Sequence, residues 1–381
     1  MPVFKKKETT ILNAPLSTNA TAMDKLITRG IDQSNGWLSF DRFMALALYA
    51  PNLGYYSART QPIGLMASSG SDFVTAPQMS PYFSRSLARS IEEALLATQM
   101  DEVWEFGAGT ALMALEILKT LGDKINRYVI VEVSSHLKEV QAQQLEAFKD
   151  KVVWMDQLPE HFSGVVVGNE VLDAMPVKLI ERRLGVWREL GVARDLQSTD
   201  LKLNWAPRPT DLSPPIDIPG EHDYLTEIHP QAEAFIKTLA ERLQRGVVFL
   251  IDYGFPEREY YHEQRSGGTL MCHQAHQADS NPLIAVGQKD ITAHVNFTGM
   301  ALAAQDSAMA VLGYTTQAHF LINSGLLDLL ESASLEEKAM AQKLITEHEM
   351  GELFKVLALG VGTSADWEPM GFQVGDRSHT L

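Results

Sequence analysis

Short apolar runs that end in a polar residue recur through the middle of the chain. Five of them are expected to be strands: Val103–Phe106, Tyr128–Val133, Lys151–Asp156, Gly164–Glu170 and Gly246–Gly254. Runs of this length are typical of strands that are buried on both faces of a parallel sheet. The segments between them, such as His136–Phe148 and Pro230–Arg245, are expected to form helices. This alternation predicts an α/β fold with helices on both faces of the sheet.

Two helices are expected before the first of these strands. Ser39–Ala50 has apolar residues at helical spacing, and a second helix is expected over Ser80–Thr98. The loop Gly54–Pro77 between them is rich in Gly, Ser and Pro but carries three aromatic residues. It is either a lid over a bound ligand or a packing segment. We therefore divide the chain into a mobile polar leader (1–22), a helical cap with a lid loop (23–98) and a sheet domain (99–381).

The sheet domain is interrupted twice. Apolar and polar residues alternate in Val177–Glu181 and again before a proline-rich stretch, which predicts an inserted β-hairpin region at about 177–223. A long polar segment is a second insertion at about 255–298, and Asp290–Thr298 within it resembles the start of an N-capped helix. The last strands are expected at Tyr314–Leu321 and Leu353–Leu359, as the antiparallel edge that closes many such sheets.

A glycine turn follows the first strand. The two glycines of Glu105–Gly109 lack a β-carbon, so a ligand can lie against the main chain with helix amides directed at it. A dinucleotide fingerprint needs a third glycine where Leu112 stands, which weakens the alternative of a nucleotide-dependent dehydrogenase. The pattern acidic-x-Gly-x-Gly fits S-adenosylmethionine better, because Glu105 could meet its ammonium group directly or through water. A turn that serves only tight packing is the other interpretation.

Acidic and amide side chains end the neighbouring strands. Glu132 lies about 20 to 25 residues beyond the glycine turn, where a carboxylate can accept both hydroxyls of an adenosine ribose. The alternative is a solvated acid at a strand end. Asp156 could accept a hydrogen bond from the adenine amino group, and Asn169 and Glu170 end the fourth strand. Because the carboxyl ends of parallel strands line the ligand crevice, we expect these side chains to converge at one edge.

Glu170 and Asp173 are the candidates for chemistry. Methyl transfer from a sulfonium is an in-line displacement, so the protein must position the acceptor and, for nitrogen, remove a proton. Carboxylates at the rim could hold a guanidinium in bidentate fashion and make one nitrogen more nucleophilic. Alternatively, both side chains only hydrogen-bond the backbone after the strand and cap the following turn.

Composition excludes several classes of function. The formal charge of -16 opposes broad binding to nucleic acid or anionic membranes, which are held chiefly by Lys and Arg. No apolar run approaches the roughly 20 residues of a membrane helix. Cys272 is the only cysteine, so neither a disulfide framework nor a multi-cysteine zinc site can form, and the nearby histidines match no closed metal-binding set. We expect no metal, and the N-terminus lacks a secretory signal, which favours a cytoplasmic protein.

Eight segments carry a resemblance to a known family: Gly54–Tyr56, Asp72–Pro77, Glu105–Thr110, Val131–Ser134, Asn169–Val177, Asp252–Gly254, Gly267–Leu270 and Asp290–Phe297. In this order they make the chain similar to the MidA-like S-adenosylmethionine-dependent methyltransferases, bacterial relatives of the mitochondrial arginine methyltransferase that helps assemble respiratory complex I. The resemblance implies a Rossmann-like class I methyltransferase sheet, an N-terminal cap over the cofactor, and a protein acceptor that could be an arginine of a complex I subunit. Gln78 and Ala111 depart from the family, which has Glu and Gly there.

These observations lead to an S-adenosylmethionine-dependent methyltransferase as the predicted function. A cofactor-binding assembly factor without turnover is an alternative. Glu170 and Asp173 are expected to face the acceptor. The cofactor is expected to lie against Thr75, Pro77, Glu105, Gly107, Ala108, Gly109, Thr110, Glu132, Val133, Asp156, Gln157 and Asn169.

Overall fold

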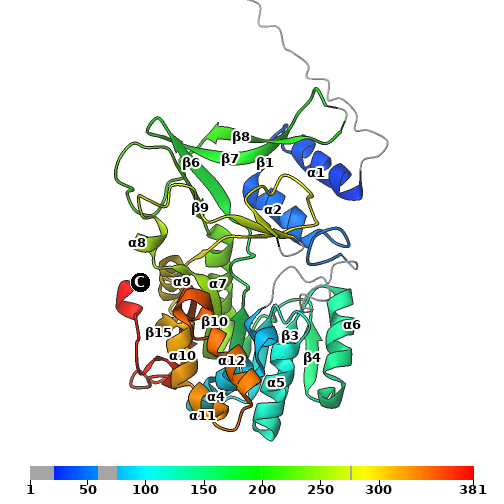
Figure 1. The fold of residues 1–381 in the computed structure, drawn as a ribbon. Coiled ribbons are helices and arrows are strands. Elements are labelled where there is room, and N and C mark those ends of the chain that lie inside the picture. Colours follow the sequence, from blue (N-terminus) through cyan, green and yellow to red (C-terminus); the bar gives the residue numbers. More distant parts are fainter. Residues whose placement is uncertain (1–20, 59–74, 199, 275–276) are drawn as a thin grey trace, which may run out of the picture.

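The computed structural model describes residues 21–58, 75–198, 200–274 and 277–381 (Figure 1). Its largest sheet has the strand order β15-β16-β10-β5-β2-β3-β4. Strands β10, β5, β2, β3 and β4 pair in parallel, while β16 pairs antiparallel with both β10 and β15. The predicted α/β sheet with an antiparallel edge is therefore confirmed. The short strand β14 (Val295–Asn296) also pairs in parallel with the end of β10. The other strands are β2 Glu102–Phe106, β3 Arg127–Val131, β4 Val152–Met155, β5 Phe162–Asn169, β10 Leu243–Phe255, β15 Ala310–Thr316 and β16 Phe354–Val361.

Helices pack on both faces of this sheet. In β5, Val165 and Val167 face one core while Val166 faces the other, because successive side chains of a strand point to opposite faces. Burial on both faces explains why the strand sequences are apolar without alternation. The first core contains helices α4 (Pro81–Thr98) and α5 (Leu112–Leu121), and the second contains α7 (Pro230–Arg242) and α9 (Phe297–Gln305).

The N-terminal cap packs on a second sheet, in the upper part of Figure 1. Ile27 and Phe43 of the cap share a core with Leu179 of the first insertion and Ile291 of the second. Helix α4, which the sequence placed in the cap, packs on the large sheet instead. The rest of the cap and both insertions are joined in one apolar core, and we call these elements together the cap layer. Its elements are α1 (Ala22–Gln33), β1 (Leu38–Ser39), α2 (Phe40–Tyr49), β6 (Lys178–Arg183), β7 (Val186–Arg194), β8 (Leu203–Pro209), β9 (Tyr224–Ile228), β11 (Met271–Gln274), β12 (Gln277–Asp279) and β13 (Asp290–Thr292).

The predicted strand over Tyr314–Leu321 is wrong in its second half. Strand β15 ends at Thr316, and helix α10 (Gln317–Asn323) follows directly. The Thr316 hydroxyl accepts a hydrogen bond from the backbone N–H of His319, which satisfies one of the free amides at the start of the helix. This N-cap, rather than hydrophobic patterning, decides where the strand gives way to the helix.

Two predicted helix boundaries are also corrected. The helix expected to start near Asp290 begins at Phe297, because Asp290–Thr292 pairs with β11 as a strand and Asn296 is the N-cap. The helix expected to reach Arg245 ends at Arg242, where the long strand β10 begins. In both places a short apolar stretch suited either structure, and pairing with a neighbouring strand decided the outcome.

Other predicted features lie partly outside the described residues. Residues 1–20 of the predicted leader and residues 59–74 of the predicted lid loop lie outside the described residues. Helix α1 was not predicted; it starts at the end of the predicted leader with Thr21 and Asp24 in a capping box. None of the helices in the described ranges combines the length and apolar composition that a bilayer crossing requires.

Candidate active site

The glycine turn after β2 has the backbone that the sequence predicts. Gly107 and Gly109 have φ angles of +66° and +52°, in the left-handed region that favours glycine. A β-carbon on Gly107 would lie 2.9 Å from Cγ2 of Val171, whereas a β-carbon on Gly109 would meet no atom within 4 Å. The turn therefore leaves open space beside its main chain, next to the start of helix α5.

Ala111 is also left-handed, with φ +64° at the N-cap of α5. The β-carbon of a residue other than glycine carries a steric cost in this conformation, so the family's usual glycine would be under less backbone strain here. Ala111→Gly should raise the free energy of unfolding by about 1 kcal/mol, because glycine adopts this conformation without the steric cost of a β-carbon. Urea unfolding of the two proteins measures the difference. An equal or lower stability of the glycine variant would contradict this account of the turn.

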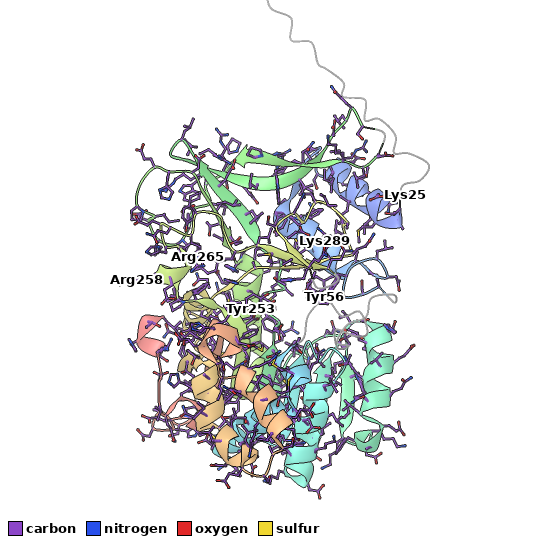
Figure 2. The ribbon with its side chains drawn as sticks, in the orientation of Figure 1. Lys25, Tyr56, Tyr253, Arg258, Arg265 and Lys289 are labelled. Atoms are coloured by element: carbon purple, nitrogen blue, oxygen red, sulfur yellow. The ribbon has the colours of Figure 1, made fainter. Side chains whose placement is uncertain are left out.

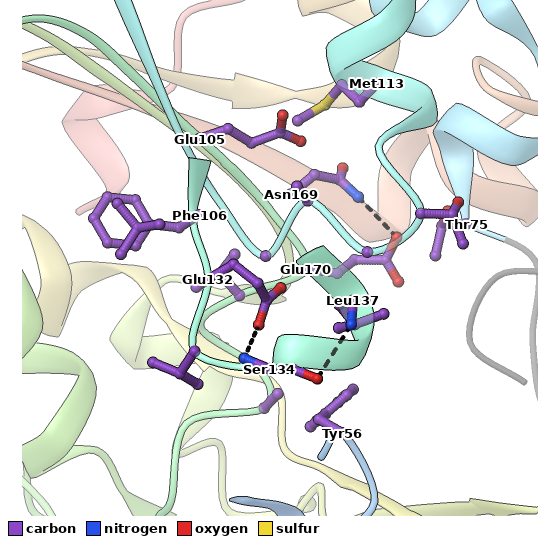
Figure 3. A pocket seen from close by; sticks show the side chains of 18 of the residues that line it. Tyr56, Thr75, Glu105, Phe106, Met113, Glu132, Ser134, Leu137, Asn169 and Glu170 are labelled. Atoms are coloured by element: carbon purple, nitrogen blue, oxygen red, sulfur yellow. Dashed lines mark hydrogen bonds between the residues drawn. The ribbon is translucent and has the colours of Figure 1, made fainter. Parts of the chain in front are cut away.

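A cavity of about 390 Å³ opens between the cap layer and the strand ends of the sheet (Figure 3). Eleven of the predicted site residues line it: Thr75, Pro77, Glu105, Gly107, Ala108, Gly109, Thr110, Glu132, Val133, Asn169 and Glu170. Residues with no predicted role also line it, among them Tyr49, Tyr56, Met113, Met175 and Phe235. The convergence of the strand ends at one edge thus agrees with the expectation from a parallel sheet.

Asp156, Gln157 and Asp173 lie outside this lining. Asp156 follows β4 with an exposed side chain and forms an ion pair with Lys138 of α6 (Ser135–Gln144). Gln157 is exposed beside it. The predicted adenine contact of Asp156 stays a prediction, and it would require the carboxylate to turn from Lys138 toward the cavity.

Glu132 follows β3 and is buried. Its Oε1 accepts the N–H of Ser134 at 2.8 Å, and its Oε2 accepts Nε2 of Gln141 at 3.2 Å. Burial raises the pKa of Glu132, and these two hydrogen bonds oppose the rise. The backbone N–H of Val133 is a third donor to this side chain. A carboxylate has about four acceptor sites, so Glu132 keeps capacity for a ribose hydroxyl.

Replacing Glu132 by alanine should weaken the binding of S-adenosylhomocysteine by about 1 to 3 kcal/mol, the scale for lost hydrogen bonds to a charged group. The same change at Glu139, exposed on α6, is the matched control and should leave the affinity unchanged. Calorimetric titration of both variants compares them directly. If the Glu132 variant binds like the control, this carboxylate does not hold the ribose.

Glu105 lies at the floor of the cavity, with only 1% of its surface exposed. Its Oε2 accepts the hydroxyl of Tyr128 at 2.6 Å. Burial raises the pKa of Glu105 to about 7, and the tyrosine hydrogen bond partly opposes this. An ammonium group placed at the glycine turn would favour the ionised form of Glu105. This carboxylate therefore fits the cationic amino-acid end of the predicted cofactor.

Glu170 directly follows β5 and has φ +53°, an uncommon conformation for a residue with a side chain. Its Oε1 accepts Nδ2 of Asn169 at 3.0 Å (Figure 3). Burial first, and then the negative charge of Asp173, raise the pKa of Glu170 to about 8. A strained backbone and a raised pKa at the wall of a cavity are typical of functional carboxylates.

Asp252 fixes the segment that follows Glu170. One oxygen, Oδ2, accepts the backbone N–H groups of Val171, Leu172 and Asp173 at 3.2, 2.9 and 3.2 Å. The neighbouring Tyr253 donates its hydroxyl to Oδ2 of Asp173 at 2.6 Å. Asp252 and Tyr253 belong to the motif Asp252–Gly254 that the sequence singles out without assigning a role. Their structural role is to hold this turn, so Asp173 lies behind Glu170 rather than in the cavity wall.

The departure at Gln78 has a structural explanation. Gln78 and Thr75 form a capping box at helix α3 (Ala76–Met79), in which Oε1 of Gln78 accepts the N–H of Thr75 at 3.2 Å. An amide oxygen can make this contact as well as a carboxylate can. The substitution therefore keeps the geometry of the cavity rim and removes one negative charge.

A parallel sheet with a glycine turn, an acid at the end of β3 and an adjoining cavity are the features of a class I S-adenosylmethionine-dependent methyltransferase. The open space at Gly109, the buried Glu105 and the remaining acceptor capacity of Glu132 fit this cofactor. Residues 86–315 match a family model described as "Putative S-adenosyl-L-methionine-dependent methyltransferase". The chain belongs to this family, which confirms the predicted MidA-like resemblance and decides against a dehydrogenase.

Relatives of known name support the same conclusion. The chain is 26% identical to the zebrafish (Danio rerio) mitochondrial protein arginine methyltransferase NDUFAF7, over 90% of this chain and 87% of the relative. It is 27% identical to the human protein of that name, over 91% and 85%. A crystal structure from Burkholderia thailandensis, bound to S-adenosyl-homocysteine, is 43% identical with a TM-score of 0.88, and the match covers 94% of this chain and 96% of the other.

Proposed function

We propose that this methyltransferase acts on an arginine side chain of a protein. The observation that carries the proposal is the Glu170 carboxylate, which lines the cavity at the end of β5 and accepts a hydrogen bond from the uncharged amide of Asn169. Asp173 adds a second negative charge behind it. A guanidinium is planar and always charged, and it donates two parallel hydrogen bonds to a carboxylate. The relatives named as protein arginine methyltransferases support the same acceptor.

In this proposal Glu170 orients the guanidinium and takes part in removing its proton. S-adenosylmethionine supplies the methyl group. The receiving nitrogen must lose one proton as its new bond to carbon forms. Glu170 has a pKa of about 8, so it holds a proton more readily than an ordinary glutamate near neutral pH. Asp252 and Tyr253 would serve as positioning residues, because they fix the turn that carries Asp173.

The test is methylation of an extract from cells that lack this protein, with an isotopically labelled methyl donor. We expect label in protein, recovered as methylarginine after hydrolysis and mass spectrometry. Label in lysine or in small molecules would overturn the arginine proposal. Binding of the cofactor without any transfer would favour an assembly factor without turnover.

We further propose a cytoplasmic location and, as the resemblance implies, a respiratory complex I subunit as the first acceptor to examine. The location is consistent with Cys272 being the only cysteine, since proteins of a reducing compartment rarely rely on disulfides. The choice of acceptor rests on the family resemblance. Comparing the methylarginine content of purified complex I from cells with and without the protein tests it, and equal content would remove complex I from consideration.

A further inference from the structure

Two tyrosines of the cap layer form part of the cavity wall, and neither has a role so far. Tyr49 ends helix α2 and Tyr56 lies in the loop that follows. Their rings are stacked, with centroids 5.6 Å apart and an angle of 24° between the planes. Tyr55 contacts Tyr56 edge-on at 5.1 Å. Both rings of the stacked pair line the cavity.

Hydrogen bonds to two other parts of the chain hold this pair in place. The hydroxyl of Tyr49 donates to the backbone oxygen of Ala174 at 2.8 Å. The hydroxyl of Tyr56 donates to Oδ1 of Asp290 in the second insertion at 2.7 Å. The first bond ties the cap to the turn after Glu170, and the second ties it to β13. The rings are therefore fixed relative to the sheet, as a preorganised binding wall requires.

The tyrosine pair belongs to the Glu170 end of the cavity. Burial first, and then the negative charges of Asp290 and Asp173, raise the pKa of both tyrosines. In the view of Figure 3, Tyr56 and Glu105 lie on opposite sides of the pocket, with Glu170 between them. Figure 2 places Tyr56 between the cap layer and the sheet domain. Tyr56 and Glu105 thus lie on different sides of the cavity in the view of Figure 3.

A polar atom at the same place still needs a donor. Asn169 lines the cavity and is 8% exposed, and its Oδ1 has no hydrogen-bond partner among the described residues. Its Nδ2 is already used by Glu170. Buried amide oxygens are seldom left without a donor, so this atom indicates a ligand with N–H or O–H groups: either the cofactor, for which Asn169 was predicted, or a group of the acceptor beside it. Oδ1 of Asn169 and the carboxylate of Glu170 can therefore both accept hydrogen bonds from the same ligand group.

We propose that Tyr49 and Tyr56 form an aromatic wall against which the acceptor guanidinium stacks while Glu170 and Asn169 accept its N–H groups. This inference rests on the proposed arginine acceptor and adds the residues that select it. A flat cation gains both from the aromatic faces and from the carboxylate. The wall therefore favours arginine over a neutral side chain of the same shape and over lysine, whose ammonium is not planar.

The experiment uses the full-length protein saturated with S-adenosylhomocysteine. The probe is N-acetyl-arginine methylamide, and the comparison is the citrulline analogue, which has nearly the same shape without the charge. Binding is measured by calorimetry or ligand-observed NMR for wild type, Tyr56→Leu and Tyr56→Phe. The phenylalanine variant is the matched control, because it keeps the ring and loses only the hydroxyl. Tyr49→Leu and Tyr49→Phe form a second pair, in which the leucine variant removes the ring and the phenylalanine variant keeps it.

We expect wild type to bind the arginine probe more tightly than the citrulline probe. Each leucine variant should bind the arginine probe roughly tenfold more weakly, while each phenylalanine variant stays within about threefold of wild type. The affinity for S-adenosylhomocysteine should be unchanged in all four variants.

Three results would overturn the inference. Unchanged arginine binding in the leucine variants would remove the wall but leave the arginine acceptor standing. Weaker binding of S-adenosylhomocysteine in those variants would assign the tyrosines to the cofactor. Equal or undetectable binding of both probes by wild type would show that no cation subsite exists here, and the labelled-extract experiment would then judge the proposed function separately.

Discussion

Replacing Glu170 by glutamine is expected to stop methyl transfer while leaving the affinity for S-adenosylhomocysteine within about threefold of wild type. Glutamine keeps the size and the hydrogen bonding of the side chain, but it removes the charge that pairs with a guanidinium and the site that can take a proton. General-base assistance alone is worth about 100- to 10,000-fold in rate. We therefore expect at least a ~100-fold loss of turnover, measured as labelled methyl transfer to protein.

The same substitution should make the protein more stable, by an amount that depends on pH. The folded-state pKa of Glu170 is about 8, above its ordinary value of 4.5. Between these pH values the unfolded chain has lost a proton that the folded protein still holds, so the stability of wild type falls as pH rises through this window. Glutamine does not titrate, so the stability of the variant does not fall in this pH window for this reason.

One pKa unit corresponds to about 1.4 kcal/mol, so the difference between variant and wild type should grow from near zero at about pH 4 to a few kcal/mol at about pH 9. Urea unfolding at several pH values measures it. Glu241→Gln, an exposed position on α7, is the control and should show no such trend. Retained turnover would remove Glu170 from the mechanism, whereas a flat stability difference would mean that its carboxylate is well solvated in the free protein.

The sequence predicted the central sheet well because burial on both faces leaves a signal in every strand. Val165–Val167 must all be apolar, whichever core each side chain enters. The glycine turn was predicted for a similar reason, since φ angles of +66° and +52° are rarely adopted by other residues. Where these constraints act locally, as at Gly107 and Glu132, the residues of the cavity could be named in advance.

The tyrosine pair of the cavity wall could not be derived in this way. Tyr49 and Tyr56 reach the cavity only because the cap shares a core with both insertions, and these segments are more than 100 residues away along the chain. The motif Gly54–Tyr56 was visible in the sequence, but nothing local indicated which surface its rings would face. Asp252 is a similar case, because its three backbone partners lie in a loop near residue 172 that β10 meets only in the folded sheet.

Gly109→Val is expected to abolish measurable binding of S-adenosylmethionine and of its demethylated product. The β-carbon at this position would enter space in which no protein atom lies within 4 Å, and Gly109 is part of the cavity lining. The two methyl groups of the valine side chain would then occupy the space that the ligand needs. Valine also tolerates a φ of +52° poorly, so the turn itself would shift. We expect an affinity loss of at least ~100-fold, beyond the range of an ordinary titration, which corresponds to about 3 kcal/mol or more.

Backbone strain and blocked space can be separated with a second glycine. Gly185, in the exposed turn between β6 and β7, has φ +75°, and a β-carbon there would also meet no atom within 4 Å, but this turn is not part of the cavity lining. Gly185→Val should therefore lower stability and leave cofactor affinity unchanged. If Gly109→Val binds the cofactor as wild type does, the methionine end does not lie against this turn. If both variants lose affinity equally, general destabilisation and not the shape of the turn is the cause.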